Sequence, residues 1–508
     1  MFTRTALPSW TALLGGAVFP LALAPYFWWP VGLISLAALY WALSQPSAPD
    51  KSTRTAFNRS WLFGFGQFGT GVSWIYVSMH DHGDTPMWLA VPAVAAFAGF
   101  LALIPAFWFT LRQKLSGQTL GVISFAAYWL LQEWCRSWFL TGFPWLYAGD
   151  AHLHTWLAGW APVSGAYVIS FILALTAASL VALRSTKRLM YLLPLVLWPA
   201  GLALKNIEWT QPVGTMTVGV VQGNVDQERK WLNEEIFPTI DRYQSDSREL
   251  FGNDLILWPE TAVTLLLQRY RPYMDLFAEE LQEHNSTVIT GIPFRWPQGT
   301  ELRGEYHNSI VAFGDGEGVY HKQRLVPFGE YIPLEKAIRG LIPFFDLPMS
   351  SFLSGARDQE PLKVTVHNES GNELALVAPF ICYEIAYPDL VTENARAADL
   401  LVTISNDAWF GDSLGPKQHM ALAQMRALET GRWVLRSTNT GISALVNHKG
   451  EITDRIPVAE RTTFSAIAER RNGDTLYMII GILPLLILAF GITLAGLLLN
   501  RKKDQSLG

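Results

Sequence analysis

Three polar residues that follow apolar stretches of this chain could together activate a nucleophile. Cys382 ends the apolar run 374–381, Glu260 follows the apolar run 255–258, and Lys322 opens a polar string. A thiol has a pKa of about 8.5 and is mostly protonated at neutral pH, so it needs a nearby base, cation or helix N-terminus to attack. Glu260 could accept the thiol proton and Lys322 could supply the positive charge. We therefore expect a nucleophilic thiol at Cys382.

The same residues could carry an acyl group through a covalent intermediate. When a thiolate attacks a carbonyl carbon, the carbonyl oxygen becomes an oxyanion, which Lys322 and the backbone N–H of Tyr383 could stabilise. Glu260 would then return its proton to the leaving group. Taken singly, the three residues have simpler interpretations: a buried small hydrophobe, a helix cap and a solvated lysine. The combination therefore carries the argument.

The composition predicts that part of the chain lies in a membrane. Of 508 residues, 50% are hydrophobic and only 16% are charged. Residues up to about 204 are a succession of apolar runs, 205–474 have the composition of a soluble α/β domain, and one apolar run returns after 475. The net charge of -5 comes without a basic stripe, so we expect no nucleic-acid partner.

The apolar runs predict eight membrane-spanning helices, since a bilayer crossing needs about 20 apolar residues. We expect a seven-helix N-terminal transmembrane domain over 1–204, an extracytoplasmic catalytic domain over 205–474, a closing transmembrane helix over 475–500 and a cytoplasmic tail over 501–508. The expected spans are 8–24, 26–44, 60–79, 87–111, 118–138, 157–183, 189–204 and 475–499. A signal peptide is the competing interpretation of the first span.

The basic residues predict the orientation, because Lys and Arg concentrate in cytoplasmic loops. On this basis both termini are cytoplasmic and the domain over 205–474 is outside. Cys135 lies in the fifth expected span, so Cys382 has no disulfide partner; an unpaired thiol in an oxidising compartment indicates a function. The basic residues between the spans are Arg4, Lys51, Arg54, Arg59, Arg112, Lys114, Arg184, Lys187, Arg188, Arg501, Lys502 and Lys503.

Strand-like and helical patterns alternate in the outer block and predict an α/β layered domain. Ligands of such folds collect beyond the carboxyl ends of the strands, where Glu260 and Cys382 fall. The expected strands are 216–221, 254–258, 287–292, 309–313, 374–381, 400–405, 433–437 and 442–447. The expected helices are 234–251, 266–284 and 417–432.

The residues from about 214 to 470 resemble the nitrilase, or carbon–nitrogen hydrolase, superfamily, whose members place a Glu-Lys-Cys triad on an αββα sandwich. Seven spans before such a domain and one after it look like the apolipoprotein N-acyltransferase family of bacteria. The matching strings are 222–224, 230–231, 258–260, 322–333, 382–384 and 406–411, with a Pro-Trp element at 142–145.

The resemblance implies a ping-pong acyl transfer in the bacterial inner membrane, with the catalytic domain periplasmic. A phospholipid, preferentially phosphatidylethanolamine, acylates Cys382, and the thioester then passes the chain to the α-amine of the N-terminal S-diacylglyceryl cysteine of an apolipoprotein. Glu260 is then the base and Lys322 the oxyanion and thiolate stabiliser. The resemblance implies no cofactor and no metal.

The resemblance also assigns supporting roles. Glu330 matches a second carboxylate that orients Lys322 or assists proton transfer, and Tyr383 and Glu384 shape the acyl pocket. The expected substrate-binding residues are Trp231, Asn308, Trp145, Phe344 and Phe345. For Trp231, ordinary aromatic packing remains an alternative.

The segment 340–349, which contains Phe344 and Phe345, is too apolar for an ordinary exposed loop. We interpret it as an interfacial lid that touches lipid and keeps water from the thioester. Burial in the core is the alternative.

Three other functions remain open at this point. A membrane-tethered amidase acting on a small amide would use the same triad, and a transporter would need ionisable groups inside the bilayer. Glu133 and Arg136 fit that last description, although a local ion pair at the membrane interface explains them better. Metal binding by the histidines of 80–82 and 152–154 is the third option, with polar loop residues as the default.

Overall fold

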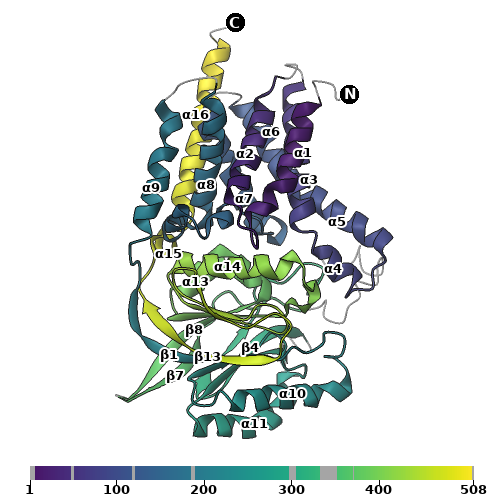
Figure 1. The fold of residues 1–508 in the computed structure, drawn as a ribbon, viewed down its shortest axis with the longest axis vertical. Helices are drawn as coiled ribbons and strands as arrows, with labels where there is room; N and C mark the ends of the chain where they lie inside the picture. The colour runs from purple at the N-terminus through teal and green to yellow at the C-terminus, as the bar shows by residue number, and fades with distance from the viewer. Residues whose placement is uncertain are drawn as a thin grey trace. The chain divides into compact units, whose positions relative to one another are not determined.

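The computed structural model describes residues 6–46, 51–116, 120–184, 189–296, 305–331, 352–369 and 371–505. The chain divides into two compact units (Figure 1). A helical unit comprises Met1–His80, Pro86–Ile207 and Ile479–Gly508, and a sandwich unit comprises Asp81–Thr85 and Glu208–Met478. The predicted lid over 340–349, with Phe344 and Phe345, lies outside the described residues.

The helical unit contains the apolar helices that the sequence predicts, although not all of them are shown to be membrane spans. Among the described residues, three stretches combine the necessary length with apolar composition: Met87–Leu115, Trp156–Ala182 and Leu483–Lys502. The predicted count of eight is not confirmed. The helices are α1 (Leu7–Val18), α2 (Trp29–Ser44), α3 (Ser52–Gly71), α4 (Ile75–His80), α5 (Met87–Leu101), α6 (Leu103–Leu115), α7 (Gly121–Trp138), α8 (Ala161–Ala182), α9 (Pro194–Leu204) and α16 (Leu483–Gln505), with α15 (Leu476–Ile480) at the unit boundary.

The number of candidate spans is smaller than predicted because several apolar helices are too short or too polar to qualify. α1 continues only as the short 3-10 turn Phe19–Ala22, so its apolar helix ends at 22, and α2 has 16 residues. α3 is 20 residues long but carries Arg59 and Gln67 on its buried side, which lowers its mean hydropathy.

Glycine allows α3 to approach α1 closely: a Cβ on Gly16 would lie 1.9 Å from the Phe63 carbonyl oxygen.

The sandwich unit is built on two mixed sheets. The six-stranded sheet has the order β13-β1-β2-β3-β4-β6, and the seven-stranded sheet has the order β12-β11-β10-β9-β8-β7-β5. The strands are β1 (Gln211–Gln222), β2 (Leu255–Leu257), β3 (Thr287–Arg295), β4 (Tyr306–Gly314), β5 (Gly316–Glu317), β6 (Val319–His321), β7 (Leu362–Asn368), β8 (Gly371–Ile381), β9 (Leu400–Ser405), β10 (Val434–Thr438), β11 (Ala444–Val446), β12 (Ile452–Arg455) and β13 (Thr462–Asn472).

The two sheets pack face to face, with helices outside each of them. Buried residues of β1 and β2, such as Val218 and Leu257, form one core with Val377 of β8 and Val402 of β9. α10 (Asn233–Arg248) and α11 (Leu267–Glu283) cover the outer face of the first sheet through a second core. α13 (Pro388–Ala395) and α14 (Leu414–Thr430) pack on the second sheet (Figure 1). The predicted layered α/β domain is therefore confirmed.

Strand direction brings the ends of several strands together at one edge of the sandwich, the edge where the parallel strands have their carboxyl ends. β1, β2 and β3 are mutually parallel, and so are β8, β9 and β10. β4 runs antiparallel to β3, and β6 antiparallel to β4, so β6 ends at the same edge as β2. The first residues of β4 also lie at this edge. Residues that follow β2, β6, β8 and β9 can therefore meet.

Candidate active site

The structure brings the three predicted catalytic residues to this shared edge. Glu260 follows β2, Lys322 follows β6 directly, and Cys382 follows β8 directly. Glu260 is 7% exposed and Lys322 1% exposed, whereas Cys382 is partly exposed. The three residues thus share one site because three separate strands end there.

Lys322 lies between two carboxylates. Its Nζ is 2.8 Å from Glu330 Oε1 and 3.5 Å from Glu260 Oε1. Burial alone would lower the pKa of the Lys322 amine, but Glu330 and Glu260 outweigh it and raise that pKa above its usual value. The amine is therefore held as an ammonium ion, which is the form that stabilises an oxyanion or a thiolate.

Asn308 holds the two carboxylates in place. Its Nδ2 donates to Glu260 Oε1 at 2.7 Å and to Glu330 Oε1 at 2.9 Å. The backbone N–H of Asn406, the first residue after β9, donates to Glu260 Oε2 at 2.9 Å. Both oxygens of Glu260 are thus fixed by donors from different strands, which orients the carboxylate before any substrate binds.

Cys382 occupies a strained turn between a strand and a helix. Its φ is +54°, in the left-handed region that residues with a side chain seldom adopt. The 3-10 helix Cys382–Ala386 begins at this residue. Burial raises the pKa of the thiol, Glu260 raises it further, and Lys322 opposes both. The resting group is therefore the thiol, and attack requires transfer of its proton.

Glu384 accepts hydrogen bonds from the strand ends beside Cys382. Its Oε1 accepts from the Tyr320 hydroxyl at 2.9 Å and from the backbone N–H of Gln323 at 2.6 Å, and its Oε2 accepts from Ile381 N at 2.7 Å. Burial raises the pKa of Glu384 to about 7. These contacts connect β6 to β8, so the Glu384 carboxylate is directed toward the ends of these two strands. Tyr383 is buried too, with its ring 5.1 Å from that of Tyr387.

A second buried network lies behind Cys382, and the sequence analysis assigned it no role. His419 Nε2 donates to the Cys382 carbonyl oxygen at 3.0 Å. Burial and Arg436 lower the pKa of His419, and its Nδ1 lies 3.1 Å from both Arg436 Nη2 and Asp407 Oδ1. Arg436 Nη2 also pairs with Asp407 Oδ2 at 2.7 Å, and both side chains are fully buried. This network holds the backbone of Cys382 from α14, β10 and the 3-10 helix Asp407–Phe410.

Lys230 is a second buried amine near the site. Its Nζ donates to the backbone oxygen of Glu260 at 3.3 Å, and burial lowers its pKa to about 8. The neighbouring Trp231, a predicted substrate-binding residue, is 39% exposed. Lys230 stands beside Trp231 in one of the strings that resemble the family, and this position is the sequence feature that could have indicated its place near the site.

Other predicted residues belong to the helical unit. Trp145 is 4% exposed and packs with its ring 5.4 Å from that of Trp74. Glu133 accepts from Trp129 Nε1 at 3.0 Å and from Ala148 N at 2.8 Å, so its contacts differ from the local ion pair that we predicted. The Arg136 guanidinium lies over aromatic rings instead. Within the described ranges, no three His, Cys, Asp or Glu residues are grouped as metal ligands.

Comparison with known proteins identifies the family. Residues 15–179 match the apolipoprotein N-acyltransferase N-terminal domain, and residues 217–470 match the carbon–nitrogen hydrolase domain. The apolipoprotein N-acyltransferase of Azotobacter vinelandii is 42% identical over 515 residues, covering 98% of this chain and 97% of its own length. The chain belongs to the apolipoprotein N-acyltransferase family.

Other apolipoprotein N-acyltransferases give the same result. The protein from Pseudomonas syringae pv. tomato is 44% identical over 89% of this chain and 90% of its own length, and that from Coxiella burnetii is 36% identical over 94% and 98%. The carbon–nitrogen hydrolase match includes all three residues predicted as the triad. Together with its apolar helices, membership of this apolipoprotein N-acyltransferase family marks the chain as a membrane protein.

Proposed function

We propose that this protein transfers an acyl chain from a phospholipid to the α-amine of the N-terminal S-diacylglyceryl cysteine of apolipoproteins, through a thioester on Cys382. The observation that carries the proposal is the family match over nearly the full length of relatives named apolipoprotein N-acyltransferase. It is supported by a thiol, an ammonium group and an oriented carboxylate at one sheet edge. The small-amide alternative accounts for the sandwich unit alone and is not favoured.

In the first half-reaction Glu260 takes the proton of the Cys382 thiol, and the sulfur attacks the ester carbonyl carbon of the phospholipid. The S–C bond forms, and the oxyanion accepts hydrogen bonds from the Lys322 ammonium group and the Tyr383 N–H. The ester C–O bond then breaks. The lysophospholipid leaves as an alcohol after receiving the proton from Glu260.

In the second half-reaction the free α-amine of the lipoprotein attacks the thioester carbon. Glu260 accepts a proton from the attacking nitrogen, the C–S bond breaks, and the thiolate of Cys382 leaves beside Lys322. Proton return from Glu260 restores the thiol. The products are an amide and the resting enzyme, so the cycle requires no cofactor or metal.

The distribution of basic residues and the relatives support a location for the protein and its catalytic site. We place the protein in the bacterial inner membrane with both termini cytoplasmic and the sandwich unit periplasmic, because basic residues lie between alternate apolar runs. Phosphatidylethanolamine is the preferred donor in this proposal. Trp231, Trp145, Phe344 and Phe345 remain the proposed substrate contacts.

Acyl transfer to the thiol is tested with a phospholipid that carries a labelled acyl chain. The wild-type protein should acquire hydroxylamine-sensitive label, and a diacylated lipopeptide with a free amine should then remove that label as an amide. Cys382→Ala should give no labelled protein, whereas Cys135→Ala should label normally, because Cys135 belongs to the helical unit.

Two results would contradict the proposal. Label on the Cys382→Ala protein at the wild-type level would exclude this thiol as the acyl carrier. Label lost to water at the same rate with and without lipopeptide would indicate a hydrolase.

A further inference from the structure

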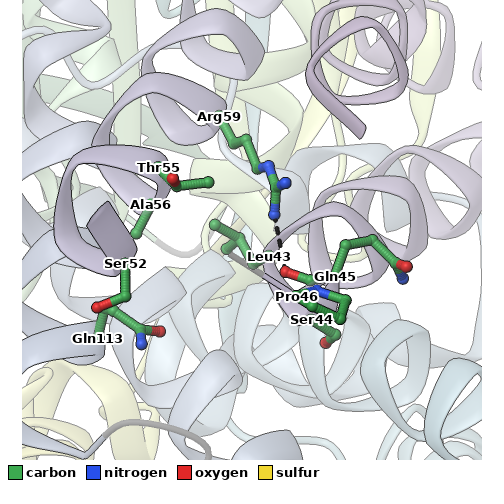
Figure 2. Close-up of a pocket in the computed structure, with 9 residues that line it drawn as sticks. All are labelled: Leu43, Ser44, Gln45, Pro46, Ser52, Thr55, Ala56, Arg59 and Gln113. Atoms are coloured by element: carbon green, nitrogen blue, oxygen red, sulfur yellow. Dashed lines mark hydrogen bonds between the residues drawn. The ribbon is translucent and has the colours of Figure 1, made fainter. Parts of the chain in front are cut away.

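Arg59 and Lys230 are buried cations that the acyl-transfer mechanism does not use. Arg59 borders a polar cavity of about 250 Å³ in the helical unit (Figure 2). Its Nη1 donates to the carbonyl oxygens of Ala42 at 2.6 Å and Gln45 at 3.0 Å, so this arginine of α3 is tied to the end of α2. Lys230 lies in the sandwich unit, and its amine contacts the candidate active site.

Lys230 belongs to the loop 223–232, which connects β1 to α10. The residue is 1% exposed, and its Nζ donates to the backbone oxygen of Glu260 at 3.3 Å. The same loop reaches the carboxylate side of the base: Gln227 Oε1 accepts from Asn406 Nδ2 at 2.7 Å, and the Asn406 N–H donates to Glu260 Oε2 at 2.9 Å. The loop is therefore connected to both the backbone and the carboxylate of Glu260.

The backbone that Lys230 contacts is a strained turn. Thr261, the next residue, has a φ of +50°, in the left-handed region that β-branched residues rarely adopt. β3 packs closely against this turn, since a Cβ on Gly291 would lie 2.7 Å from Glu260 Cα. A residue in such a conformation persists only where its surroundings fix it. The Lys230 amine supplies one such contact, at the peptide that joins Glu260 to Thr261.

The start of the loop is fixed by contacts that do not involve Lys230. Asn439, which follows β10, accepts at Oδ1 from the Val225 N–H at 2.9 Å and donates from Nδ2 to the Val225 oxygen at 2.7 Å. The Asn224 N–H donates to the backbone oxygen of Asn439 at 3.0 Å. Loss of the Lys230 amine should therefore change the contact with Glu260 more than the course of the loop.

The charge of Lys230 strengthens its contact with Glu260. Burial lowers the pKa of the Lys230 amine to about 8, and the Glu260 carboxylate opposes that shift. The amine is therefore mainly an ammonium ion at neutral pH, and a charged donor forms the stronger hydrogen bond. The pKa values of Lys322 and Cys382 are raised above their usual ranges, so these two groups titrate at higher pH than Lys230.

We propose that Lys230 is a positioning residue for the base of the acyl transfer: it fixes the backbone of Glu260 so that the carboxylate is oriented before substrate binds. This inference rests on the proposed role of Glu260 as the base. Lys230 acts through Glu260, because its own amine is buried and does not meet the substrate. Lys322 remains the cation that stabilises the oxyanion.

The test measures acylation of Cys382 by labelled phospholipid in single-turnover reactions of the purified full-length protein. No acceptor amine takes part in this half-reaction. Lys230→Met removes the amine and keeps an unbranched side chain. Lys363→Met is the matched control, because Lys363 is a surface lysine of β7 that pairs with Glu317. The rate is followed from about pH 6 to about pH 10 at several phospholipid concentrations, and Tm shows whether each variant is folded.

We expect Lys230→Met to lower the maximal acylation rate at least about tenfold, since a hydrogen bond from a charged group is lost. The phospholipid concentration that gives half this rate should stay within about twofold of wild type, because Asn439 still fixes the loop. The wild-type rate should fall above about pH 8, where the Lys230 amine becomes neutral, and Lys230→Met should lack this fall. Lys363→Met should behave as wild type.

Alkylation of Cys382 by iodoacetamide separates this inference from the proposed function, because it needs transfer of the thiol proton but no phospholipid. Alkylation that is severalfold slower in Lys230→Met supports the inference, even if the wild-type protein forms no thioester and the proposed function fails. Alkylation at the wild-type rate overturns it, as does an acylation rate within about twofold of wild type. A wild-type acylation rate that does not fall above about pH 8 also overturns it, and this measurement needs no variant.

Discussion

A neutral amide is as important to the candidate site as its charged groups. Glu260 and Glu330 share one ammonium ion, so the two carboxylates need further donors to hold them in place. Asn308 donates to both carboxylates from a single nitrogen. It therefore fixes both carboxylates without adding a second cation. Asn308 acts by positioning the base and the lysine.

Replacing this amide by a third carboxylate should disable the site. In Asn308→Asp two hydrogen bonds to charged groups are lost, each worth about 1.5–3 kcal/mol, and a like charge is added. We expect acyl-enzyme formation to slow by at least about a hundredfold, measured in single-turnover reactions with labelled phospholipid. Asn372→Asp, at the exposed start of β8, is the control and should react normally. A normal rate for Asn308→Asp would exclude the positioning role.

The sequence was sufficient to propose the triad residues but contained little information on the contacts that hold them in place. Cys382, Lys322 and Glu260 stand in recognisable strings, so each could be named before any geometry was known. The position of Asn308 depends on the register of β4 against β3, where it pairs with Pro293. Residues that meet across two strands are not separated by a characteristic number of positions, so the sequence alone does not reveal the contact. Lys230 was missed for the same reason, because its contact is to a backbone oxygen thirty positions away.

At the scale of elements, the position of Cys382 depends on three elements that follow β8 in the chain. The 3-10 helix Asp407–Phe410 that follows β9 supplies Asp407, α14 supplies His419, and β10 supplies Arg436. Their buried hydrogen bonds terminate at the carbonyl oxygen of Cys382. A residue held at positive φ persists only where its surroundings fix it, and this network supplies that constraint.

Breaking this network should destabilise the protein in a pH-dependent way. Burial alone would raise the pKa of Asp407, but Arg436 and His419 outweigh it and hold that pKa below its usual value. The carboxylate therefore stabilises the fold above its unfolded pKa of about 3.9, and the contribution is lost as the pH falls below it. Asp407→Asn should lower the free energy of unfolding by about 3 kcal/mol at pH 7.

Thermal unfolding of the purified protein at pH 7 and near pH 3.5 checks this expectation. The difference in Tm between wild type and Asp407→Asn should be large at pH 7 and smaller at the lower pH. Asp412→Asn is the control, since Asp412 pairs with Lys417 at an exposed position. A difference in Tm that grows on acidification would contradict the proposed sign.

The strands that sequence patterns located are those buried on both faces. β9 is buried at every position, and its predicted bounds are confirmed. β7 and β13 were missed, because alternating burial mixes polar and apolar residues along each strand. In β13 the charged string Glu469, Arg470 and Arg471 is typical of a solvent-exposed segment. Both arginines are nevertheless buried, and each forms an ion pair with a glutamate. The burial of such positions depends on partners that are distant in the sequence, so it cannot be predicted from the local pattern of polar and apolar residues.

At the scale of the whole molecule, the central question is how often the chain crosses the membrane. The three stretches that meet the length and hydropathy requirements are an odd number, which would place the two termini on opposite sides. Eight crossings place both termini on the same side. The basic residues favour eight, since they recur after every second apolar run. Accessibility of single positions can therefore decide between the two counts.

Single-cysteine variants in a Cys135→Ala, Cys382→Ala background provide this test. Asp275→Cys lies on the exposed side of α11 in the sandwich unit, and Arg501→Cys lies near the end of α16. With the proposed orientation, a membrane-impermeant maleimide should label residue 275 in intact spheroplasts and residue 501 only after permeabilisation. In that orientation Arg501 and Lys502 would keep the end of the last helix in the cytoplasm, because moving charged side chains through the hydrocarbon core is costly. Labelling of residue 501 in intact spheroplasts would place the C-terminus outside and contradict the orientation.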